Sequence, residues 1–174
     1  MAEHWNMLTL IGEDKPGIVA AITQALFDQG LNLGETSMLR LGGNFTVMMM
    51  VNGGDDEQVL RERLKPVIEG QGMCLHIDPI EARLHQHLLP NVQVTVSGAD
   101  RAGIVAQVTA ALAESGFNIL GLESVVAGTA DQPVYMMQIS GVVDVPVESI
   151  DAAMAPVRSQ GVDINVTAIE TYIG

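Results

Sequence analysis

Cysteine, aromatic side chains and basic residues are all scarce in this chain of 174 residues. The single cysteine, Cys74, has no partner for an internal disulfide, which is typical of a reducing cytoplasm. Aromatic residues make up 3% of the chain, so aliphatic and methionine side chains must build its core. Cys74 alternates with apolar neighbours, which predicts that it is buried there. No apolar run approaches the roughly 20 residues of a membrane span, and the first residues lack a signal-peptide pattern, so we expect a cytoplasmic protein.

Basic residues number 8 against 21 acidic ones, which gives a formal net charge of −13. Nucleic-acid binding requires clustered lysine and arginine side chains that neutralise phosphates. The densest basic group, Arg61, Arg63 and Lys65, is interleaved with glutamates, as is typical of a solvated helix face. The composition therefore argues against direct contact with DNA or RNA.

Familiar catalytic motifs are also missing from the sequence. It contains no Ser-His-Asp set, no paired-carboxylate pattern and no Gly-Lys-Ser/Thr phosphate loop. His85 and His87 are spaced to present two imidazoles to a metal ion, but a third ligand at a suitable spacing is absent from the sequence. We expect a protein that is not an enzyme and that has neither a cofactor nor a metal site.

The most informative feature that is present is a repeat. Residues 12–20, Gly-Glu-Asp-Lys-Pro-Gly-Ile-Val-Ala, reappear at residues 98–106 as Gly-Ala-Asp-Arg-Ala-Gly-Ile-Val-Ala, an offset of 98 − 12 = 86. The same offset relates Gly30 to Gly116. A constant offset over this length indicates a tandem duplication of one folding unit. The sequence predicts a first domain over residues 1–81, a linker over 82–90 and a second domain over 91–174.

Hydrophobic periodicity predicts the same order of elements in each half: strand, helix, strand, strand, helix, strand. This is the order of the ferredoxin-like split unit, an α+β fold with a four-stranded antiparallel sheet and two helices on one face. Because the other sheet face and the edge strands need partners, we expect the repeats to pair with each other or across a homo-oligomer. The expected strands cover residues 6–12, 31–41, 45–51 and 73–80, then 92–97, 117–126, 134–142 and 162–171.

The expected helices follow from apolar residues spaced three and four apart. In the first helix, which ends at Gly30, this spacing places Ile18, Val19 and Ile22 on the buried face. The second helix has an N-cap in Asp55 or Asp56 and ends before Gly70–Gly72. Helices are also expected over residues 102–115 and, as one continuous segment, over 147–159.

The repeated loop carries the best candidate site. It combines a carboxylate (Asp14 or Asp100) and a cation with glycines where a strand leads into a helix, whose N-terminus favours a ligand carboxylate. Asn32 and Asn118 open the next strand and offer both a hydrogen-bond donor and an acceptor. These groups suit an α-amino acid, which has one carboxylate and one ammonium. The alternatives are structural: the aspartates cap their helices, the loop glycines permit close packing, and the asparagines serve the turns.

The strand-Gly-x-Asp-Lys-Pro-Gly-Ile-Val motif, followed by Gly-x-Asn at residues 30–32, resembles the ACT domain, a small module that binds amino acids. The resemblance covers essentially the whole chain as two modules, and the absence of an enzyme domain looks like the glycine cleavage system transcriptional repressor family. Well-known members that bind amino acids often have His at the position of Gly12 and Asn at that of Asp14, and this chain departs from both. ACT effectors usually lie between two modules. The resemblance therefore implies ligand contacts at Gly12, Asp14, Lys15, Gly17, Asn32, Gly98, Asp100, Arg101, Gly103 and Asn118.

From these observations we predict a non-enzymatic regulator that responds to a small amino acid. The resemblance implies that glycine is the first ligand to test and that the protein represses transcription by contacting an activator protein. Two alternatives stay open: a regulatory subunit that acts in trans on a separate metabolic enzyme, and a constitutive protein–protein adaptor without a ligand.

Overall fold

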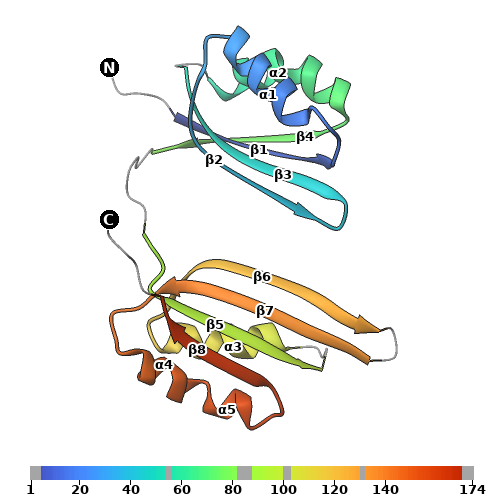
Figure 1. Ribbon diagram of the computed structural model, residues 1–174. Helices are drawn as coiled ribbons and strands as arrows, with labels where there is room; N and C mark the ends of the chain where they lie inside the picture. Colours follow the sequence, from blue (N-terminus) through green and yellow to red (C-terminus); the bar gives the residue numbers. More distant parts are fainter. Residues whose placement is uncertain (1–4, 54–55, 82–87, 100–102, 130–131, 170–174) are drawn as a thin grey trace. The chain divides into compact units, whose positions relative to one another are not determined.

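The computed structural model describes residues 5–53, 56–81, 88–99, 103–129 and 132–169. The chain divides into two compact units, a first module over Met1–Gln86 and a second module over His87–Gly174. In each module a four-stranded antiparallel sheet has its helices on one face (Figure 1), which confirms the expected α+β ferredoxin-like fold. The predicted linker over 82–90 lies partly outside the described residues, and its boundaries stay a prediction.

The first module forms one sheet in the order β2-β3-β1-β4 under two helices. Side chains on the helix side of the sheet alternate with those on the other side, and Leu8, Leu10 and Val47 from the strands pack against Ile22 and Leu64 from the helices. The elements are β1 (Trp5–Glu13), α1 (Ile18–Asp28), β2 (Asn32–Leu41), β3 (Asn44–Asn52), α2 (Glu57–Gln71) and β4 (Cys74–Ile80).

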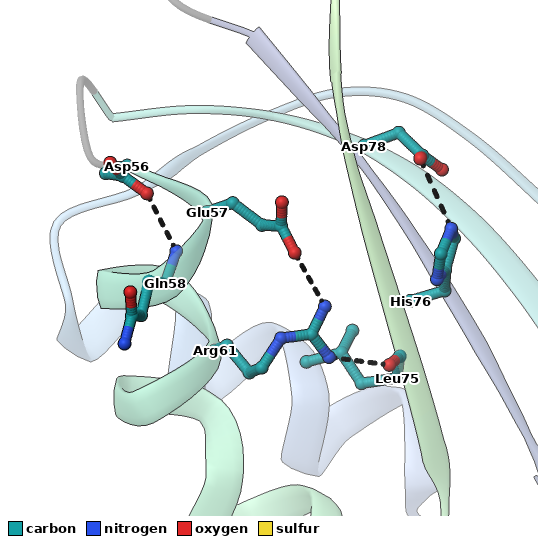
Figure 2. Close-up of polar contacts among 7 residues, drawn as sticks. All are labelled: Asp56, Glu57, Gln58, Arg61, Leu75, His76 and Asp78. Atoms are coloured by element: carbon teal, nitrogen blue, oxygen red, sulfur yellow. Dashed lines mark hydrogen bonds and ion pairs between the residues drawn. The ribbon is translucent and has the colours of Figure 1, made fainter.

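Polar contacts fix the start of α2 and its position on β4, as Figure 2 shows. The Asp56 carboxylate accepts a hydrogen bond of 2.9 Å from the Gln58 N–H, so Asp56 is the N-cap. One turn later the Arg61 guanidinium donates to Glu57 at 2.8 Å and to the carbonyl of Leu75 at 3.1 Å. A side chain of α2 is thereby joined to the backbone of β4.

The second module repeats this plan with sheet order β6-β7-β5-β8 and a core of valine, isoleucine and methionine side chains. Among the described residues of both modules, no helix is long and apolar enough to cross a membrane. The elements are β5 (Val92–Ala99), α3 (Ile104–Glu114), β6 (Asn118–Thr129), β7 (Gln132–Val142), α4 (Val147–Ala153), α5 (Ala155–Arg158) and β8 (Asp163–Ala168).

The single helix predicted over 147–159 is wrong, because the structure divides it into α4 and α5 at Met154. Pro156 has no N–H to donate to the preceding turn, so the helical hydrogen-bond ladder is interrupted there. Arg158 then holds the short α5 in place, because its guanidinium donates to the carbonyl of Ile164 on β8 at 2.9 Å and to that of Asp151 at 2.8 Å.

Two predictions about burial are also wrong. Cys74 is exposed, because it pairs with Ile11 in the ladder and lies with that residue on the sheet face that no helix covers. Val19 is 41% exposed, whereas Ile18 and Ile22 are buried as expected. In both cases the neighbours in the sequence are apolar, but the side chain itself points to solvent.

A one-residue irregularity occurs near the start of the second strand in each module. The β2–β3 register shifts between Leu33 and Thr36, and the β6–β7 register shifts between Ile119 and Gly121. Each shift is a β-bulge, which places one extra residue on the edge strand. The bulge is therefore part of the repeated design.

Candidate functional site

The Asp14 carboxylate, in the loop between β1 and α1, contacts a side chain of β2 and does not cap the helix. Asp14 forms an ion pair with Arg40 of β2, and its backbone N–H donates to the carbonyl of Gly43 at 3.2 Å. The N-cap of α1 is Gly17, and no side chain caps this helix. The alternative reading of Asp14 as a helix cap is therefore wrong.

Gly17 and Gly103 start their helices in the left-handed backbone region, at φ of 87° and 91°. A Cβ atom added to either glycine would meet nothing within 4 Å. The alternative that these glycines permit close packing is therefore wrong, and their φ values are what favour glycine. Gly12 differs, because a Cβ there would lie 2.8 Å from Cγ of Met73.

A pocket of about 370 Å³ opens beside the loop of the first module. This volume is at the lower end of the range of small-molecule sites. One of the residues that line the pocket, Arg40, is a candidate ligand contact that the sequence alone did not indicate. The pocket is lined by Asp14, Lys15 and Gly17 of the loop, by residues 18–20 at the start of α1, and by Met38, Arg40 and Phe45 of the sheet.

Charges of both signs lie around this pocket. The Asp14 side chain is 26% exposed, the Arg40 side chain is 70% exposed, and Lys15 forms an ion pair of 2.9 Å with Glu13. The uncapped start of α1 adds the positive end of a helix dipole. A zwitterion could therefore place its ammonium against Asp14 and its carboxylate against a cation.

Within one module, the strand pairing of the sheet places the Asp14 loop and Asn32, two parts of the predicted site, at opposite ends of the sheet. Gly12 pairs with Phe45, which pairs with Arg40, at the loop end of the sheet. Asn32 pairs with Asn52, which pairs with Trp5, at the opposite end. These two rows are 12 − 5 = 7 residues apart along β1, about 23 Å at 3.3 Å per residue. Asn32 therefore does not meet the Asp14 loop of its own module.

The same geometry recurs in the second module. Gly98 pairs with Tyr135, which pairs with Val126, so Val126 holds the place that Arg40 has in the first module. Asn118 starts β6 at the far end of this sheet, opposite Val142. Asp100 and Arg101, which the sequence predicts as ligand contacts, lie outside the described residues.

Within the part of the chain that the structure describes, no group of three or more His, Cys, Asp or Glu side chains is placed to hold a metal ion. His76 lies 3.2 Å from Asp78 on β4, and the two form an exposed pair (Figure 2). His85 and His87, which the sequence suggested as two imidazole ligands, both lie outside the described residues.

The fold and the repeated loop define a protein of two ferredoxin-like modules in tandem, each with a left-handed glycine at the start of its first helix. Residues 6–78 match the ACT domain, and residues 92–155 match it again. The chain therefore belongs to the ACT-domain family, as a protein with two ACT domains in tandem.

A relative with a known name matches most of this chain. The glycine cleavage system transcriptional repressor of Escherichia coli (strain K12) is 27% identical over 124 residues, which cover 71% of this chain and 65% of that protein. The chain thus spans about two thirds of the length of this relative.

Solved structures also align with nearly the whole chain. A protein of unknown function from Galdieria sulphuraria is 25% identical, with a TM-score of 0.75 over 97% of this chain and 99% of that one. The crystal structure of a protein described as a glycine cleavage system transcriptional repressor has a TM-score of 0.74, with 98% and 100% of the two chains covered. At 16% identity, this second likeness shows the fold alone.

Proposed function

We propose that this chain is a non-enzymatic regulator that binds a small amino acid and represses transcription through a partner protein. The observation that carries the proposal is the pocket beside the β1–α1 loop of an ACT domain, with the opposite charges of Asp14 and Arg40 at its wall. The Escherichia coli relative, named a transcriptional repressor of the glycine cleavage system, supports the transcriptional role and makes glycine the first ligand to test.

The proposed ligand contacts are those of the repeated loop. Asp14 supplies a carboxylate for the ammonium group, and Lys15, Arg40 and the start of α1 supply positive charge for the ligand carboxylate. Asn32 contributes only where its strand end meets the loop of a different module. The same holds for Asn118. For the second module the repeat predicts the equivalent contacts Gly98, Asp100, Arg101 and Gly103, and the stoichiometry of binding tests whether they are used.

A protein partner fits this chain better than a nucleic acid does. The net charge of −13 opposes approach to phosphate backbones. The open face of the first sheet, which we define by Ile11, Leu39, Leu41 and Met48, instead exposes apolar side chains. An activator protein or a second copy of the chain, in the cytoplasm, would cover such a surface.

Binding would act by shifting an equilibrium between two arrangements of the protein. A ligand that prefers one arrangement by about 1.4 kcal/mol changes a balanced equilibrium tenfold. A small number of charge-assisted hydrogen bonds at one pocket provides a free-energy difference of that size.

Isothermal titration calorimetry against glycine, serine, alanine and the other common amino acids tests the proposal. We expect selective, saturable binding that is lost in the double variant Asp14→Ala, Asp100→Ala, while circular dichroism shows an intact fold. Asp28→Ala is the matched control, because Asp28 lies at the opposite end of α1 and contacts Gln24. Ligand affinity that is unchanged in the double variant would remove both carboxylates from the site.

A constitutive adaptor is the second candidate, and the exposed open face of the first sheet is the observation that favours it. An adaptor needs a docking surface and no ligand. The absence of binding by any amino acid at millimolar concentration, together with capture of the same partner with and without amino acids, would select the adaptor.

A further inference from the structure

We propose that the first module alone binds the amino acid as a zwitterion, and that Arg40 is the residue that selects for the ligand carboxylate. This inference rests on the proposed amino-acid binding and makes it specific. It assigns one ligand to each chain and assigns the selectivity to a strand residue outside the repeated loop.

The ion pair of Asp14 and Arg40 has the charges that a zwitterion needs, at the wall of a pocket of about 370 Å³. The Arg40 side chain is 70% exposed, and such exposed pairs are weak. An α-amino acid could therefore separate the pair, with its ammonium on Asp14 and its carboxylate on the guanidinium. One ion pair would be replaced by two charge-assisted contacts, one of which uses the forked geometry of arginine.

The other nearby cation, Lys15, offers a single point charge without the forked geometry with which arginine binds a carboxylate. Its ammonium lies 2.9 Å from the carboxylate of Glu13, the last residue of β1. Arg40 instead extends from β2, and its row in the ladder, Gly12–Phe45–Arg40, places it across the sheet from the start of the loop. The ligand would thus be held between a loop and a strand.

The second module lacks this cation. By the ladder, Val126 replaces Arg40, Ser124 replaces Met38 and Tyr135 replaces Phe45. The sequence of the second module has only two basic residues, Arg101 and Arg158. Arg158 is bonded to Asp151 and to Ile164 on the other side of the fold from β6. Without a guanidinium on β6, the second module has no strand residue that could bind a carboxylate in this way.

The repeat supplies its own variant: Arg40→Val gives the first module the residue that the second module already has. The full-length chain is titrated calorimetrically with glycine, L-alanine and L-serine, and with the amines that lack their carboxylates, namely methylamine, ethylamine and ethanolamine. We expect one amino acid per chain and a clear preference over the matching amine. Arg40→Val should weaken amino-acid binding by about ten- to a hundredfold and remove most of that preference, the size expected for one charge-assisted contact.

Val126→Ala is the matched control, because it changes the same ladder position in the second module. We expect it to leave affinity and stoichiometry unchanged, and loss of binding in this variant would overturn the inference. Circular dichroism checks that Arg40→Val is folded, as the exposure of Arg40 leads us to expect.

The remaining outcomes separate the two proposals. If the wild-type chain binds two amino acids, or if Arg40→Val binds within twofold of the wild type, the assignment to Arg40 and to the first module is wrong, whereas amino-acid binding stands. If none of the three amino acids binds the wild type at millimolar concentration, both proposals fall.

Discussion

The start of α1 and the end of α2 allow one chemical change to be tested at two backbone conformations. Gly17 has a φ of 87°, whereas Gly70 lies inside α2 and has no such positive φ. At both positions a Cβ atom would meet nothing within 4 Å. The substitutions Gly17→Ala and Gly70→Ala therefore differ in backbone strain and not in steric clash.

The two variants should shift the free energy of unfolding in opposite directions. A left-handed conformation costs a residue with a Cβ about 1–2 kcal/mol, so Gly17→Ala should destabilise the first module by about that amount. Alanine in place of glycine within a helix stabilises by about 0.5–1 kcal/mol, so Gly70→Ala should raise the stability. The free energies of unfolding of the two variants should therefore differ by about 1.5–3 kcal/mol.

Trp5 makes the assay specific to the first module. It is the single tryptophan of the chain and is 9% exposed, so its fluorescence should change when this module unfolds. With a urea m-value of about 1 kcal/mol per M for a unit of this size, the two midpoints should differ by about 1.5–3 M. A shift of both midpoints in the same direction, or a Gly17→Ala variant as stable as the wild type, would refute the assignment of strain to Gly17.

Two further predictions concern α2 and β4. Asp56→Ala removes the carboxylate that accepts from the Gln58 N–H, and should lower the stability of the first module by about 1 kcal/mol in the same fluorescence assay, whereas Glu62→Ala on the exposed part of that helix should change it by less than about 0.5 kcal/mol. Cys74 is exposed, so an aromatic disulfide reagent should titrate one thiol per chain in the native protein as fast as it does in urea. Slow labelling that becomes fast only in urea would mean that the thiol is covered, for example by a partner chain.

Much of the fold could be predicted because the repeat and the periodicities are local signals. The loop motif fixed the number of modules, and the turn glycines Gly30 and Gly116 marked the helix ends that the structure shows, each with a positive φ. Strand alternation is a local signal of the same kind, and within β3 Met49 is buried and Met48 is 45% exposed. These features depend on residues close together in the chain.

The errors depend on contacts between distant segments. Strand alternation predicts that Cys74 and Leu75 point to opposite faces of the sheet, but the pairing of β4 with β1 decides which of the two faces the helices. The separation of Asn32 from the Asp14 loop likewise follows from the direction of β2 within the sheet. Arg40 was missed because nothing near it in the sequence shows that it reaches Asp14. The one feature of the sequence that could have drawn attention to Arg40 is that basic residues are few, 8 against 21 acidic ones.

The bulge at the start of β2 lets this edge strand hold one extra residue without changing which sheet face the later side chains point to. With one extra residue between Leu33 and Thr36, Met38 and Arg40 point to the pocket side of the sheet, and Leu39 and Leu41 point to the open face. Loss of that single residue would make the β2–β3 ladder regular, with Thr36 still opposite Met49 and Arg40 still opposite Phe45, so the arginine would keep facing the pocket. The pocket is thus shielded from the loss of a residue at the bulge, and substitution at the position of Arg40, where the second module has Val126, is the route by which an ACT module exchanges a charged pocket wall for an apolar one.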